Sequence, residues 1–132
     1  MSYATQVASY REMEILSASP ERLVVLLFDH LVVQLQRARI AIGNNDVNLR
    51  TVSLSKARGI VSELLSTLDF AKGGRIAKDL GSLYTFLLAE MADVGLHRDA
   101  RKVDRLIQIT ETLRVGFTGA AGSLAAPAKR PA

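Results

Sequence analysis

The chain has 132 residues, a formal net charge of +4 and hydrophobic residues at 48% of its positions. This length suits one domain with a real core, and no uninterrupted apolar run reaches the roughly 18 residues that a membrane span needs. Cysteine is absent, which excludes disulfides and thiol chemistry. The opening MSYATQVASY lacks the basic and apolar regions of a secretory signal. We therefore expect a cytoplasmic protein without membrane insertion.

Turn-forming residues divide the chain into four expected helices. They fall at 43–46, at 72–74 and around 95–97, and the long stretches between them lack proline. The first helix is expected over 20–42, with Ser19 as its N-cap and Pro20 at the first helical position. The others are expected over 48–71, 75–94 and 99–117. Residues 119–132 are rich in Gly, Ala and Pro without periodicity, which predicts a disordered tail.

Each expected helix carries an apolar stripe at helical spacing. In chain order the four stripes are Val24, Leu27, Phe28, Leu31, Leu35, Ala38 and Ile42; Ala57, Ile60, Val61, Leu64 and Leu68; Ile76, Leu80, Leu83, Leu87 and Met91; and Val103, Leu106, Ile107, Thr110, Leu113 and Phe117. Amphipathic helices joined by short loops predict an all-α fold, an antiparallel four-helix bundle. We expect it to occupy residues 1–118 as one domain.

The first helix is apolar on more than one side. Once its core stripe is assigned, Leu26, Val33 and Ile40 remain on roughly the opposite side, spaced by seven, with Val25 and Val32 on the flank. Such a stripe left in water indicates a partner, a membrane surface or a covering segment. The alternative is that this helix is central and packs on two sides, which requires no ligand.

The segment before the first helix is also apolar on one face. Tyr3, Val7 and Tyr10 fall at helical spacing, and Ile15 follows them. We expect residues 1–16 to form a short helical lid that lies in a groove of the bundle and can leave it. A permanently docked strap explains the same pattern.

The sequence shows no sign of catalysis. His30 and His97 are the only histidines, and the carboxylates are scattered, with no pair on an apolar face. Gly73 and Gly74 lack the surrounding residues of a phosphate-binding loop and predict a helix end. His97 and Asp99 also predict helix ends rather than a metal site. We therefore expect no enzyme activity, no metal and no cofactor.

The sequence pI of about 9.8 raises the question of nucleic acid. Arg98, Arg101, Lys102, Arg105 and Arg114 are interleaved with acidic residues, a pattern typical of a solvated helix face. We expect no nucleic-acid partner. A basic helical nucleic-acid-binding protein is the alternative function, and its affinity would fall steeply with salt. Self-association through the second stripe of the first helix is a third interpretation.

The order of residues along most of the chain resembles the bacterial flagellar export chaperone FliS family. Tyr10 stands ten residues before the proline of ASPERL at 18–23, and LFD follows at 27–29. Further matches are KA at 56–57, EL at 63–64, GG at 73–74 and LY at 83–84, so that the similarity covers residues 8–117. Phe28 and His30 depart from the tyrosine and glycine usual in the family, and DV at 93–94 and GF at 116–117 depart as well.

The resemblance implies a cytoplasmic chaperone that binds the disordered C-terminal segment of flagellin, prevents its premature polymerisation and assists its export through the flagellar type III secretion system. A component of the export gate is a second candidate partner. The resemblance also implies that the N-terminal segment occupies part of the groove that flagellin takes. The predicted partner-binding residues are Tyr10, Ile15, Val25, Leu26, Val32, Val33, Ile40 and Ile109.

Overall fold

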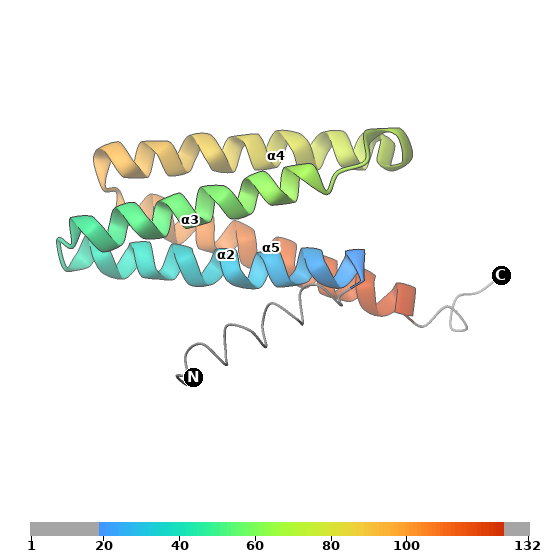
Figure 1. Ribbon diagram of the computed structural model, residues 1–132, viewed down its shortest axis with the longest axis horizontal. Coiled ribbons are helices and arrows are strands. Elements are labelled where there is room, and N and C mark those ends of the chain that lie inside the picture. Colours follow the sequence, from blue (N-terminus) through green and yellow to red (C-terminus); the bar gives the residue numbers. More distant parts are fainter. Residues whose placement is uncertain (1–18, 126–132) are drawn as a thin grey trace, which may run out of the picture.

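The computed structural model describes residues 19–125, with side chains over 19–119. This part of the chain forms four helices, α2 (Pro20–Gly43), α3 (Val47–Ser66), α4 (Phe70–His97) and α5 (Ala100–Ala125). Successive helices run in opposite directions and form a bundle (Figure 1), which confirms the predicted all-α fold. None of these helices is long and apolar enough to cross a membrane.

Short polar side chains fix where three of the helices begin. The Ser19 hydroxyl accepts a hydrogen bond of 3.2 Å from the backbone N–H of Arg22, and Pro20 occupies the first turn, which confirms the predicted start of α2. The carboxylates of Asp46 and Asp69 accept from the third following N–H in the same way, at 2.9 and 3.0 Å. Each cap satisfies a backbone donor that the first helical turn leaves unpaired.

Three helices differ from the sequence prediction by three residues or more at one end or both. The third was expected over 75–94 and spans Phe70–His97. The second helix stops at Ser66 instead of continuing to 71, because Asp69 caps a new helix that starts at Phe70. The last helix was expected to end at 117 but continues to Ala125, because the alanines and leucine of this stretch favour helix enough to offset its glycines. The rest of the expected tail, 126–132, and the expected lid, 1–16, lie outside the described residues.

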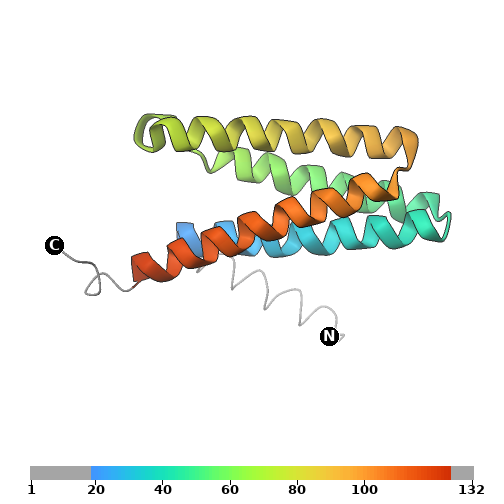
Figure 2. The same ribbon diagram turned by 180° about the vertical axis from the view of Figure 1, so that it is seen from behind.

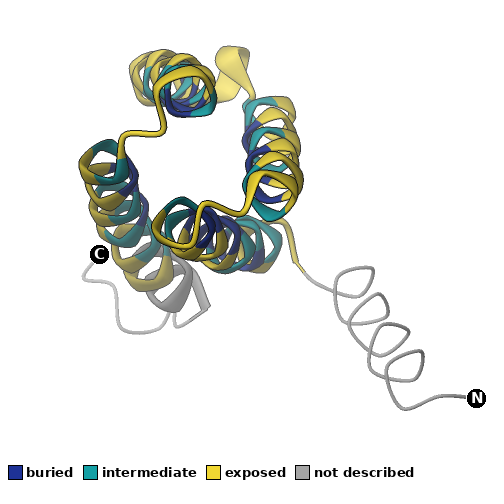
Figure 3. Cartoon of the chain, turned by 90° about the vertical axis from the view of Figure 1, so that its left-hand side faces the viewer, coloured by how far each residue is buried: buried dark blue, intermediate teal, exposed yellow. Residues whose placement is uncertain are grey.

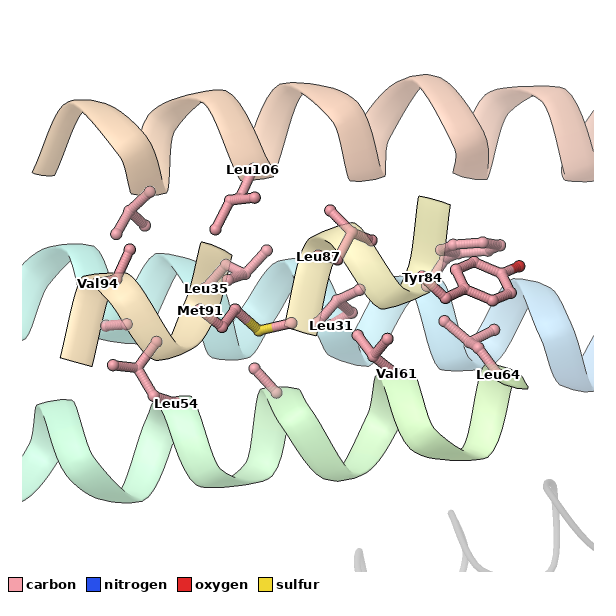
Figure 4. Packing of buried hydrophobic residues seen from close by; sticks show 14 residues of the cluster. Leu31, Leu35, Leu54, Val61, Leu64, Tyr84, Leu87, Met91, Val94 and Leu106 are labelled. Carbon is pink, nitrogen blue, oxygen red and sulfur yellow. The ribbon is translucent and has the colours of Figure 1, made fainter. Parts of the chain in front are cut away.

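The core lies where the four helices face one another (Figure 3), and its side chains interdigitate along the length of the bundle (Figure 4). The predicted stripes supply most of it. Ile76 is an exception, because it was assigned to the core stripe of its helix and is 73% exposed. The fully buried core consists of Phe28, Leu31, Leu35, Ala38, Leu54, Ala57, Val61, Leu64, Tyr84, Leu87, Met91, Val94, Val103 and Leu106.

Helix α2 is enclosed by its neighbours on two sides. It packs closely against both α3 and α5. Arg39 Nε lies 2.9 Å from Asp104 Oδ1 of α5, so the side of α2 that carries Arg39 faces α5. Val25 and Val32 lie on that side, at helical spacing from Arg39, and both are buried. The alternative of a central helix is therefore correct for this flank.

Helix α4 is interrupted near its start by Gly74, whose φ of 53° and ψ of −128° are essentially confined to glycine. The interruption confirms the predicted break at 72–74. The ring of Phe70 lies beside Gly81, where an added Cβ would be 3.5 Å from the ring. The first turn of α4 therefore folds back over the longer part of the helix. We call residues 67–74 the hook.

The strained position of Gly74 predicts the effect of a substitution. Gly74→Ala is expected to lower the free energy of unfolding by about 1–3 kcal/mol, because a residue with a Cβ is strained in this conformation. Gly59→Ala in α3 is the control: no atom lies within 4 Å of its added Cβ, and it is expected to raise stability by up to about 1 kcal/mol. Urea denaturation followed by circular dichroism measures both. A Gly74→Ala variant as stable as the unsubstituted chain would contradict the prediction.

Candidate functional site

Helices α4 and α5 meet at the short turn that joins them and diverge towards their other ends (Figure 2). They are less closely packed against each other than α2 is against α3. At the joined end, Lys102 Nζ of α5 lies 2.6 Å from Asp93 Oδ2 and 3.2 Å from Glu90 Oε2 of α4. These ion pairs hold one end of the α4–α5 pair together and leave the other end open.

The ion pairs at the joined end also shift proton equilibria. The hydrogen bond from Lys102 lowers the pKa of Asp93, and the hydrogen bonds to Asp93 and Glu90 raise the pKa of Lys102. His97 Nδ1 lies 2.9 Å from Asp93 Oδ1. The carboxylate of Asp99 accepts backbone hydrogen bonds from the first turn of α5. His97 and Asp99 therefore mark helix ends, as predicted.

The ion pairs identify the faces that α4 and α5 turn towards each other. Ile76 and Leu83 precede Glu90 at intervals of seven residues, and Ile109 follows Lys102 by seven, so each set lies on one helix face. Ile76 is exposed, and Leu83 and Ile109 are half-buried. The diverging faces are therefore apolar beyond the ion pairs. We call Ile76, Leu83 and Ile109 the α4–α5 seam.

A pocket of about 210 Å³ lies at the open end of the bundle. We call it the end pocket. Its volume exceeds the roughly 150 Å³ of an engineered apolar cavity that binds benzene, so it has room for one large side chain. Helix α2, the hook, the start of α4 and the far part of α5 all contribute to its wall, which is formed by Val24, Thr67, Leu68, Asp69, Gly73, Ile76, Ala77, Leu80, Tyr84 and Phe117.

Two aromatic rings, Tyr84 and Phe117, line the end pocket, and Phe28 lies behind them. The ring centroids of Phe28 and Phe117 are 5.3 Å apart, and those of Phe28 and Tyr84 are 6.3 Å apart. Phe28 is fully buried among rings and aliphatic side chains, a setting that suits a ring without a hydroxyl. Tyr84 is only 1% exposed, and burial raises its pKa to about 12.

The hydroxyl of Tyr84 has no hydrogen-bond acceptor among the described residues. In Figure 4 its oxygen points away from the neighbouring core side chains. Because Tyr84 lines the end pocket, its hydroxyl adds a hydrogen-bond donor to a wall that is mostly apolar and whose other polar side chains are Thr67 and Asp69.

The structure separates the predicted partner-binding residues into groups. Tyr10 and Ile15 lie outside the described residues. Val33 and Ile40 are 41% and 57% exposed on the outer side of α2, and Ile109 belongs to the α4–α5 seam. The remaining three, Val25, Leu26 and Val32, are buried, so the prediction that they form an exposed stripe is wrong.

Sequence reasoning missed the end pocket. Ile76, Leu80 and Phe117 were assigned to core stripes, because helical periodicity identifies a helix face without showing whether a neighbouring helix covers it. Gly74 was the available signal, since a chain interruption beside an apolar stripe indicates a change of direction at the end of a bundle.

Three basic residues of the described helices are held in ion pairs. Lys102 is paired with two carboxylates, Arg39 with Asp104, and Arg114 with Glu111 at 2.7 Å. A phosphate-binding surface depends on cations that are available to phosphates. In the described part of the chain, no group of three or more His, Cys, Asp or Glu side chains is placed to hold a metal ion.

The ion pairs of Lys102 predict a specific pH dependence. Asp93 has a lowered pKa, so its contribution to stability is present above the ordinary value of 3.8 and is lost as the pH falls through its lower value in the folded protein. Lys102→Met is expected to lower the melting temperature at neutral pH and to weaken the fall in stability below pH 3.8. Arg105→Met, which removes a cation of α5 without an ion pair among the described residues, is the control. The melting temperature of each variant is measured from neutral to acidic pH. If it falls with pH by the same amount in the Lys102→Met variant and in the unsubstituted chain, this assignment is wrong.

Comparison with known proteins places the chain in a family. A family model described as "Flagellar protein FliS" matches residues 3–123. The flagellar secretion chaperone FliS of Salmonella typhimurium is 35% identical over 96 residues, which cover 72% of this chain and 71% of the relative. The FliS protein of Campylobacter jejuni is 30% identical over 95 residues, which cover 72% and 74%.

A third relative extends the match. The flagellar secretion chaperone FliSB of Pseudomonas aeruginosa is 27% identical over 108 residues, which cover 82% of this chain and 86% of the relative. These relatives are chaperones and not enzymes. Because the family model matches almost the whole helical bundle and the relatives match most of their own lengths, the chain belongs to the FliS family of flagellar secretion chaperones.

Proposed function

We propose that this chaperone binds the C-terminal segment of flagellin in the cytoplasm, prevents its premature polymerisation and assists its export through the flagellar type III secretion system. The relatives are flagellar secretion chaperones, which supports a role in flagellar secretion. The observation in the structure that supports a polypeptide partner best is the end pocket, which continues into the apolar α4–α5 seam. A component of the export gate is proposed as a second partner.

The physical need for such a chaperone follows from how a filament protein assembles. The terminal helices of flagellin bury their apolar faces against other segments in the filament, so a monomer in the cell requires these faces to be covered. A disordered segment that folds on its chaperone loses conformational entropy. This loss limits the affinity, so that the complex can still dissociate. An apolar surface on a stable bundle provides the required cover.

The proposed contact surface is larger than the end pocket alone. Disordered segments can wrap around extended surfaces of a folded partner. We include the exposed Val33 and Ile40 of α2 in the surface, together with Ile109 of the seam. Tyr10 and Ile15 are proposed to take part through the N-terminal segment.

The end pocket is tested by a matched pair of substitutions on α4. Ile76 and Leu96 are exposed aliphatic residues, at 73% and 78%, near opposite ends of this helix. Ile76→Asp is expected to weaken binding of a flagellin C-terminal peptide by roughly tenfold or more, because it removes apolar burial at the pocket rim. Leu96→Asp is expected to leave binding unchanged. Isothermal titration calorimetry measures both affinities, and melting curves verify folding.

Equal losses in the two α4 variants would show that the end pocket has no special part in binding. The proposed function itself is tested by the unsubstituted chain in the same titration, because a peptide that does not bind to it would count against flagellin as the partner.

The outer side of α2 is tested separately. Val33→Asp is expected to weaken peptide binding while the bundle stays folded, since Val33 is 41% exposed. Leu31→Asp is expected to unfold the bundle, because Leu31 is fully buried and an unpaired carboxylate in the core is strongly destabilising. Circular dichroism and calorimetry distinguish the two effects. A folded Val33→Asp variant with unchanged affinity would remove this side of α2 from the proposed surface.

A further inference from the structure

We infer that the end pocket is an anchor site for a single residue of the bound segment, one whose apolar side chain fills the pocket and whose neutral hydrogen-bond acceptor receives the hydroxyl of Tyr84. The inference deepens the proposed function and rests on it for the identity of the segment.

The shape and lining of the end pocket favour one inserted side chain. Its volume of about 210 Å³ is formed by segments from all four helices or their connections, so its walls depend on the folded bundle and are in place before a partner arrives. Aliphatic and aromatic side chains make up most of the lining. Large apolar side chains seated in such preformed pockets commonly supply much of the affinity of an interface.

The Tyr84 hydroxyl determines the polar part of the recognised residue. The hydroxyl makes no hydrogen bond to a described residue, and its oxygen is not one of the fully buried unpaired atoms, which are Gln34 Oε1 and Ser53 Oγ. It is therefore a donor at the pocket surface, and a partner that supplies an acceptor there gains a hydrogen bond in a largely apolar setting. A carboxylate is a poor candidate for that acceptor, because an ionised group loses its hydration in an apolar site. The acceptor is therefore an amide oxygen, either of the backbone or of a glutamine or asparagine side chain.

The surroundings of the end pocket point to a polypeptide occupant. Exposed Ile76 lies on the rim, and the α4–α5 seam continues from it, so a chain anchored in the pocket can follow the seam across further apolar surface. A small molecule bound in the pocket would not contact the apolar surface along the seam.

The charges beside the pocket specify the neighbouring residues of the occupant. A wider hollow of about 810 Å³ is lined by Arg75, Lys78 and Asp79 together with Phe70 and Gly74. Within the described part of the chain, Arg75 and Lys78 have no ion pair. Two cations against one carboxylate give the wall of this hollow a net positive charge, whereas Asp69 lines the end pocket itself. An acidic residue of the occupant is therefore favoured on the side of Arg75 and Lys78 and disfavoured inside the pocket.

The test uses Tyr84→Phe, which removes the hydroxyl and keeps the ring. Its affinity for a flagellin C-terminal peptide is expected to fall about tenfold in calorimetry, while its melting temperature stays the same, since the hydroxyl makes no hydrogen bond to a described residue. Thr110→Val is the control. Its hydroxyl is also buried but donates to the Leu106 carbonyl of its own helix at 2.8 Å, so peptide binding is expected to be unchanged.

A second measurement tests the pocket without flagellin. 4-Methylpentanamide combines an aliphatic body with an amide oxygen, and we expect it to shift the NMR methyl signals of Ala77 and Leu80 in the unsubstituted chain. Tyr84→Phe is expected to weaken this binding several-fold. Val24→Phe, which fills the pocket from its wall, is expected to abolish it.

The outcomes separate the two proposals. If Tyr84→Phe binds both the peptide and the amide as tightly as the unsubstituted chain, the anchor inference is wrong and the proposed function stands. If the peptide does not bind to the unsubstituted chain, the proposed function fails, and the amide titration alone decides whether the pocket accepts an apolar group with an acceptor. Methyl shifts that are confined to residues outside the pocket would also overturn the inference.

Discussion

The enclosure of α2 between α3 and α5 is the constraint on which the rest of the structure depends. This helix is apolar on several sides, and the bundle uses two of them: one faces α3, and the other faces α5 across the Arg39–Asp104 ion pair. Burying both sides places α3 and α5 on either flank of α2. Helix α4 then closes the bundle opposite α2, where it meets its neighbours over a smaller area.

The weaker packing of α4 explains why the candidate site lies where it does. Lys102, Asp93 and Glu90 fasten α4 to α5 at the end where the chain turns, and the two helices diverge away from this point. At the open end the hook folds back beside α4, and Gly74 permits the sharp change of direction. The hook and the rings of Tyr84 and Phe117, which contact the buried ring of Phe28, thus line a pocket at this end of the bundle.

This division suits a chaperone of the FliS family. The buried part of the bundle is complete in itself and provides stability, while the open end and the seam present apolar surface to a partner. Contiguous exposed apolar patches are uncommon on monomeric soluble proteins and usually mark an interaction site. The seam itself is apolar, and the ion pairs of Lys102 lie beyond it at the joined end. Recognition along the seam therefore depends on shape and apolar contact, and two cations, Arg75 and Lys78, lie near the hook.

The sequence by itself determined the helical class, the four helices of residues 19–125, the N-cap at Ser19 and the break at Gly74. It could do so because periodicity and local hydrogen bonding are properties of neighbouring residues. It also identified Val33, Ile40 and Ile109 as surface candidates, and their exposed or half-buried positions agree with that. Tertiary structure decided the rest. Val25 and Val32 are buried because α5 covers that flank of α2, and Ile76 is exposed because no helix covers the open end of α4. Both outcomes depend on the directions in which distant helices cross, and the spacing of residues within one helix contains no information about those directions.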